Sequence, residues 1–232
     1  MSRTVALGRL LFRIRSWIPL PVIAIVAAVL ALVPASPSAA LLGFGLFCCA
    51  LGQGLRAWVL GSVPHGTSGQ DAYLEAVSLN THGPYAHVRN PLYLGNFLIC
   101  AGLALAAANP LAAAIGLGFF ALEYAFIVPA EEQFLAERFG AGFARYRAEV
   151  PRWLWRLRAA AAPGPVRFDW RRALRKEHNP LCAWGSGLLG LLALQAHGSP
   201  RSLAVLGGLE LALLVGFVAV KGWKRRWWLA GS

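Results

Sequence analysis

The chain has 232 residues, of which 57% are hydrophobic and 14% are charged, and its formal net charge is +12. A water-soluble domain carries about 25% charged residues, so this chain lacks the polar surface that a soluble globule needs. In a soluble protein, a net charge this positive would suggest a nucleic-acid partner. In an apolar chain, Lys and Arg more often orient the cytoplasmic loops and contact anionic lipid headgroups, so we expect no nucleic-acid partner.

Six apolar stretches have about the length that crosses a bilayer, which is roughly 20 residues. The first follows a basic N-terminus, and its length favours an uncleaved span over a signal peptide. Asn109-Pro110 separates the third from the fourth so closely that these two must form a tight helical hairpin. The stretches cover, approximately, residues 17–33, 39–60, 92–108, 111–130, 180–196 and 202–220.

The distribution of Lys and Arg predicts the orientation of these helices. If the N-terminus lies in the cytoplasm, Arg201 is the only one of 22 Lys and Arg residues in an outside loop. We therefore predict an all-α, polytopic membrane bundle of about six transmembrane helices with both termini cytoplasmic, in a bacterial inner membrane. Its predicted parts are an N-terminal transmembrane helix (1–38), a membrane core (39–153), and a basic linker with two C-terminal transmembrane helices (154–232).

Cysteine and histidine give no strong metal signal. The four cysteines lie within or beside apolar runs without a CxxC pair, which is typical of packing residues. His82 and His87 flank a Gly-Pro turn, where a headgroup contact or a proton acceptor is a better interpretation than a metal ligand. We predict no metal site.

Polar residues gather in two segments, 81–95 and 131–152, that the hairpin returns to the same membrane face. Asn90-Pro91 begins a helix whose free N–H groups could hold a carboxylate or a ribose hydroxyl. On composition alone, an interfacial helix cap with two aromatic-belt tyrosines is the simpler interpretation. Glu131-Glu132 ends the fourth stretch, where a helix disfavours negative charge, so we expect these carboxylates to receive a cation or ribose hydroxyls.

The order of these residues resembles a known family. Gly-Pro-Tyr, Val-Arg and Asn-Pro-x-Tyr-x-Gly precede the hairpin, and Glu-Glu-x-x-Leu-x-x-x-Phe-Gly-x-x-Phe-x-x-Tyr-x-x-x-Val-Pro-Arg follows it. Over roughly residues 39–153 this pattern is similar to the isoprenylcysteine carboxyl methyltransferase and phospholipid methyltransferase superfamily. The resemblance implies a membrane enzyme that uses S-adenosylmethionine to methylate a lipid-embedded acceptor. It implies cofactor contacts at Gln70, Val77, Ser78, Leu79, Asn80, Tyr85, Asn90, Pro91, Leu92, Tyr93 and Glu131.

Two positions depart from this resemblance. Asn90 stands where the family usually has His, and Asn can cap a helix but cannot act as a titrating base. Ile127 stands where isoprenylcysteine enzymes place an Arg one turn before the acid, to hold the substrate carboxylate. We therefore expect a lipid amine, a lipid hydroxyl or another apolar acceptor at least as readily as a prenylcysteine.

The catalytic residues stay open at this stage, as does the oligomeric state. Tyr93, Asn90 and Glu123 are positioning candidates, although Glu123 is equally well explained as an internal polar contact. Gln53 and Arg56 are expected at the cytoplasmic mouth of the pocket. The candidates for contact with an anionic substrate headgroup, or else for a solvated basic face, are Arg145, Tyr146 and Arg147.

Two other functions remain possible from the sequence. Membrane sterol and steroid reductases, which use NADPH, share the two-segment layout and a similar Pro-x-Tyr-x-Gly element. A non-catalytic membrane scaffold that kept the fold is the third hypothesis, supported by Asn90 and Ile127.

Overall fold

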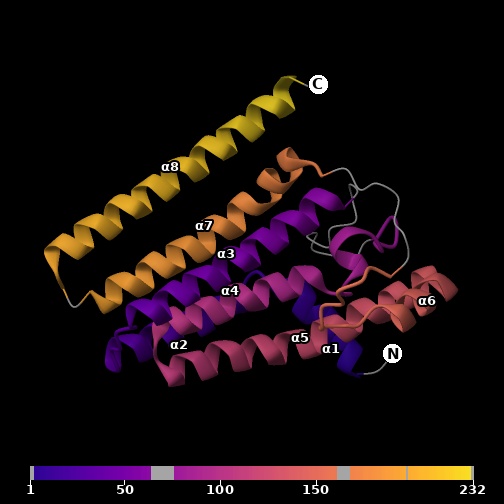
Figure 1. The fold of residues 1–232 in the computed structure, drawn as a ribbon, viewed down its shortest axis with the longest axis horizontal. Coiled ribbons are helices and arrows are strands. Elements are labelled where there is room, and N and C mark those ends of the chain that lie inside the picture. The colour runs from indigo at the N-terminus through magenta and orange to yellow at the C-terminus, as the bar shows by residue number, and fades with distance from the viewer. Residues whose placement is uncertain (1–2, 64–75, 161–167, 197, 231–232) are drawn as a thin grey trace.

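The computed structural model describes residues 3–63, 76–160, 168–196 and 198–230, and within these ranges it contains helices and no strand (Figure 1). The all-α prediction is confirmed. The elements are α1 (Arg3–Ile14), α2 (Pro19–Leu32), α3 (Ala39–Ser62), the 3₁₀-helix η1 (Gly83–Ala86), α4 (Pro91–Ala107), α5 (Pro110–Phe139), α6 (Ala141–Glu149), α7 (Trp170–Gln195) and α8 (Pro200–Ala230).

Three of these helices, α3, α5 and α8, are long and apolar enough to cross a membrane, and the pair α1–α2, bent by 75°, makes a possible fourth. The chain is thus an integral membrane protein by the length and composition of its helices. The other predicted spans are α4, which at 17 residues is about 25 Å long, and α7, which begins with charged turns. A hydrocarbon core is about 30 Å thick, so a count of six spans stays a prediction.

The helices lie side by side, and α1 begins and α8 ends toward the same end of the bundle, the one that carries α6 (Figure 1). The cytoplasmic location of both termini stays a prediction. The predicted hairpin is present between α4 and α5. Asn109 closes it, because its Oδ1 accepts from the N–H groups of Leu111 (3.1 Å) and Ala112 (3.0 Å) while its Nδ2 donates to the Val33 carbonyl (2.8 Å).

Glycines let α3 and α4 approach until their backbones touch. A Cβ built at Gly45 would lie 2.7 Å from the Gly102 carbonyl oxygen, and one at Gly52 would lie 2.6 Å from that of Gly95. Small residues at such crossings are typical of helix packing in membranes, where close backbone contact replaces the hydrophobic effect. This crossing brings the start of α4, and with it the Asn90–Tyr93 motif, against α3.

We expect Gly45→Ala to destabilise the protein in detergent by about 1–3 kcal/mol, because the backbones must separate to admit a methyl group. Gly43→Ala is the matched control, since a Cβ at Gly43 meets no atom within 4 Å and lies on the same helix. Thermal unfolding of the two variants measures the difference. Equal stability of the two variants would show that the α3 and α4 backbones are not in close contact at Gly45.

Candidate active site

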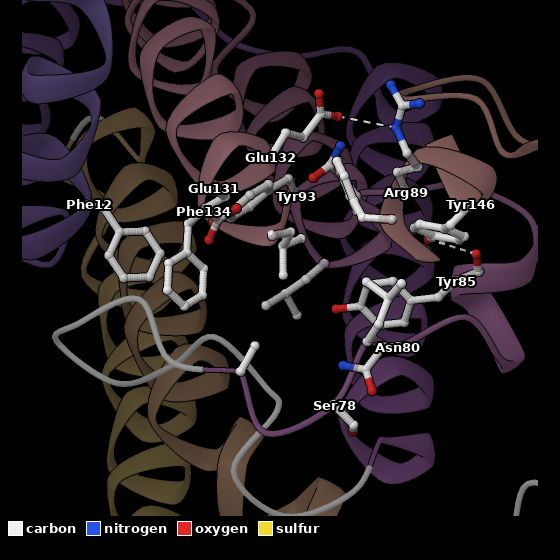
Figure 2. A pocket seen from close by; sticks show the side chains of 16 residues that line it. Phe12, Ser78, Asn80, Tyr85, Arg89, Tyr93, Glu131, Glu132, Phe134 and Tyr146 are labelled. Carbon is white, nitrogen blue, oxygen red and sulfur yellow. Dashed lines mark hydrogen bonds and ion pairs between the residues drawn. The ribbon is translucent and has the colours of Figure 1, made fainter. Parts of the chain in front are cut away.

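A cleft opens at the α6 end of the bundle, between the end of α1, the start of α4, the second half of α5, α6 and residues 76–85 (Figure 2). Its empty volume is about 860 Å³, and this volume includes space that is open to solvent. The lining mixes aromatic rings with amide, hydroxyl and carboxylate groups. The cleft is therefore suited to an organic ligand that has both apolar and polar parts.

Most of the residues predicted to contact a cofactor meet in this cleft. Val77 is 73% exposed and does not line it, and Pro91 is buried at the first turn of α4. Gln70 lies outside the described residues. Those that line it are Ser78, Leu79, Asn80, Tyr85, Asn90, Leu92, Tyr93 and Glu131.

Glu131 and Tyr93 form the polar centre of the cleft (Figure 2). The Tyr93 hydroxyl donates to Glu131 Oε1 at 2.7 Å, and Tyr93 is 9% exposed. Because the hydrogen bond uses one carboxylate oxygen, the other can accept a hydroxyl or an ammonium group. A half-buried carboxylate in such a cleft is a natural partner for a cationic ligand.

Glu132 also lines the cleft, but the cations that it receives are two arginines of the chain itself. Arg89 Nε lies 3.1 Å from Glu132 Oε1, and the Arg152 guanidinium also binds this carboxylate. Adjacent residues of an α-helix point about 100° apart, so the two acids face different partners. Arg89 Nη1 also donates to the Arg147 carbonyl at 2.7 Å. Glu132 therefore fastens the residues after α6 to the start of α4.

Main-chain hydrogen bonds reinforce this link between residues 86–90 and 151–160. The bonds are Arg89 N to Pro151 O (2.9 Å), Arg156 N to His87 O (3.0 Å) and Ala160 N to Ala86 O (3.0 Å). Asn90 contributes to it, since its Nδ2 donates to the Arg152 carbonyl at 3.2 Å and its side chain makes no cap bond to α4. Of the two tasks open to Asn90, its side chain therefore donates a hydrogen bond and does not cap α4.

Two tyrosines form the opposite wall. The Tyr146 hydroxyl donates to the Tyr85 carbonyl at 2.9 Å. Burial raises the pKa of each of these two phenols well above the ordinary pKa of tyrosine. Both hydroxyls consequently stay protonated at neutral pH. Arg145 and Arg147, in contrast, are exposed and do not line the cleft.

Part of the chain matches a known protein family. Residues 41–142 match the family of phospholipid methyltransferases. The match covers most of the membrane core that the sequence predicted. The superfamily expected from the sequence pattern is thereby confirmed, and it implies a membrane methyltransferase. No curated protein and no solved structure matches the chain.

The phospholipid methyltransferase match contains Asn90–Tyr93 and Glu131, but two parts of the cleft lie beyond it. Phe12, on α1, and Phe143, on α6, both line the cleft and are 2% exposed. Phe143 belongs to the Phe-Gly-x-x-Phe part of the pattern, which offered a signal for it. Phe12 had none, because it precedes the first predicted span and belongs to no motif.

Ile127, the second departure, is fully buried against Phe12, Tyr93 and Val128. A cation nevertheless lies near this cluster. The Arg15 guanidinium stands 3.8 Å from the centre of the Phe12 ring, and it is close enough to interact electrostatically with Glu131 and with Glu123. Glu123 itself is buried on α5 and does not line the cleft.

Gln53 and Arg56 do not line the mouth of the cleft, which corrects a further expectation. Both bind Glu177 of α7 inside the bundle, at 2.6 Å from Gln53 Nε2 and 2.7 Å from Arg56 Nη2. The side chains of Arg56 and Glu177 are 7% and 6% exposed. Among the described residues, no three His, Cys, Asp or Glu side chains gather where they could hold a metal ion.

Proposed function

We propose that the chain is an S-adenosylmethionine-dependent methyltransferase that acts on a lipid-embedded acceptor at the cytoplasmic face of a bacterial inner membrane. The observation that carries this proposal is the Tyr93–Glu131 pair in an aromatic and amide-lined cleft, within the residues that match the phospholipid methyltransferases. A reductase finds less support, since this family transfers methyl groups.

The residues of the cleft suit the chemistry of this cofactor, which presents a sulfonium cation, an ammonium group, a carboxylate and an adenosine. Glu131 would accept from the ammonium group or the ribose hydroxyls, and the rings of Tyr85 and Tyr93 would face the cation. Ser78 and Asn80 offer hydroxyl and amide groups at the other side of the cleft (Figure 2). Bound there, S-adenosylmethionine would supply an activated methyl group.

The protein's own contribution to methyl transfer would be to hold two reactants in line and to exclude water. The link between residues 86–90 and 151–160 keeps the wall of the cleft in place for this purpose. Ile127 itself offers no cation to a prenylcysteine carboxylate, although the Arg15 guanidinium lies near its cluster. A lipid amine or hydroxyl is therefore proposed as the acceptor at least as readily as a prenylcysteine. Tyr146 lines the cleft and is the best placed of the three residues proposed to contact a substrate headgroup.

The test is to incubate membranes with methyl-labelled S-adenosylmethionine, with wild-type protein or with Glu131→Gln, and to locate the label by lipid chromatography. Label in a lipid fraction that depends on Glu131 supports the proposal. Calorimetry with S-adenosylmethionine and with NADPH accompanies it. Binding of NADPH alone would favour a reductase, and binding of S-adenosylmethionine without transfer to any membrane component would favour a scaffold.

A further inference from the structure

Helix α7 lies beside α3 (Figure 1) but outside the residues that match the family. It places the carboxylate of Glu177 inside the bundle. We propose that Glu177 of α7 is a positioning residue for the Tyr93–Glu131 pair, acting through Arg56, Asn96 and Tyr124. This inference rests on the proposed function of that pair. It assigns α7 a part in the active site in addition to its part in the membrane bundle.

The first step is the fixed orientation of Arg56. Glu177 Oε1 accepts from Arg56 Nη2 at 2.7 Å, and Glu177 Oε2 accepts from Arg56 Nε at 2.9 Å and from Gln53 Nε2 at 2.6 Å. Trp184, also on α7, donates from Nε1 to Gln53 Oε1 at 2.7 Å. A two-pronged bond of this kind leaves a guanidinium one orientation.

The second step runs from Arg56 to α4. Its Nη1 donates to Asn96 Oδ1, so the Asn96 amide must turn its Nδ2 the other way, where it donates to the Tyr124 hydroxyl at 2.9 Å. Gly95 makes the passage possible, since a Cβ there would lie 2.6 Å from Arg56 Cγ. The glycine of the Asn-Pro-x-Tyr-x-Gly motif is thus explained by the side chain that crosses it.

The third step reaches the cleft. The ring centres of Tyr124 and Tyr93 are 4.4 Å apart with the rings tilted by 52°, and the Tyr93 hydroxyl donates to Glu131 at 2.7 Å. Because Asn96 holds the Tyr124 hydroxyl, the Tyr124 ring restricts how Tyr93 can turn. Without Glu177, Arg56 loses its fixed orientation, the Asn96 amide can reverse, and the hydroxyl of Tyr93 is held less firmly against Glu131.

A polar contact between α7 and α8 serves as the comparison. Ser186 Oγ donates to Glu210 Oε1 of α8 at 2.7 Å, and neither residue lines the cleft. A change at Ser186 therefore affects the packing of α7 against α8 without acting on Arg56. Variants at the two places of the same helix separate positioning from packing.

The experiment is a double-mutant cycle on the full chain in lipid nanodiscs, with the affinity for S-adenosylmethionine by calorimetry and the initial rate of methyl transfer as readouts. We expect Glu177→Gln to lower affinity or rate about tenfold, and to cause less than about a twofold further loss when Tyr93 is already Phe. Ser186→Ala should leave both readouts within about twofold of wild type.

A second variant guards against loss of folding in Glu177→Gln. Tyr124→Phe removes one hydroxyl and leaves the Arg56–Glu177 pair intact, and it should show the same non-additivity with Tyr93→Phe. Losses that add in both cycles would refute the inference while the proposed function stands. Wild-type protein that neither binds S-adenosylmethionine nor transfers its methyl group would refute the proposed function, and the inference with it.

Discussion

Replacing Glu131 with glutamine should weaken the binding of S-adenosylmethionine by about 10- to 100-fold. A hydrogen bond to a charged group contributes about 1.5–3 kcal/mol, and Glu131 is the carboxylate that Tyr93 holds in the cleft. Glutamine keeps the shape and can still accept from Tyr93, but it carries no charge for a cationic ligand. Calorimetry on protein in nanodiscs measures the affinity, and the rate of methyl transfer should fall at least as far.

Glu137→Gln is the matched control for this prediction. Glu137 lies on the same helix, its side chain is 55% exposed, and its partner Arg9 is exposed as well, so an effect on the cleft is not expected. Thermal unfolding should place both variants close to wild type. An unchanged affinity in Glu131→Gln would place the cofactor away from Glu131, and the proposed site would then be wrong.

The helical bundle and the proximity of Tyr93 to Glu131 could be predicted from local sequence patterns, and the structure shows why. Proline and asparagine at 109–110 end one helix and cap the next, so the hairpin could be read from two residues. Tyr93 and Glu131 could be paired because their motifs flank that hairpin, which returns both to one end of the bundle. Such features can be predicted from the sequence because they depend on residues that are close together in the chain.

The contacts that the sequence missed join distant parts of the chain. Arg56 and Glu177 are 121 residues apart, and neither belongs to a sequence motif that would predict their contact. Glu132 looked equivalent to Glu131, although the helical rotation between adjacent residues directs it to Arg89 and Arg152. Phe12 reaches the cleft because the chain bends by 75° between α1 and α2, which apolar periodicity alone does not predict.

The structure explains in part why Asn, and not the His usual in the family pattern, can stand at position 90. Asn90 donates an amide N–H to the Arg152 carbonyl, at 3.2 Å, and so takes part in holding residues 151–160 against residues 86–90. A residue with this task needs a donor, not a titrating base.

Removing the charge of Glu177 alone should destabilise the protein far more than removing both members of its ion pair. Breaking a buried pair by deleting one partner costs about 3–5 kcal/mol, because the remaining charge is left without compensation. Arg56 would be that charge in Glu177→Ala, with its side chain 7% exposed inside an apolar bundle. The double variant Arg56→Met with Glu177→Met should recover most of the loss, since it leaves no buried charge.

The free energy of unfolding in detergent, measured for both single variants and the double, tests this prediction. Arg9→Ala is the comparison, because the exposed pair Arg9–Glu137 should contribute about 0–1 kcal/mol. A double variant as unstable as the singles would mean that the hydrogen bonds to Gln53 and Asn96 dominate over the charge. If the double variant instead recovers stability but not affinity for S-adenosylmethionine, stability does not explain why the pair is present, and its contribution lies in the orientation that it gives Arg56.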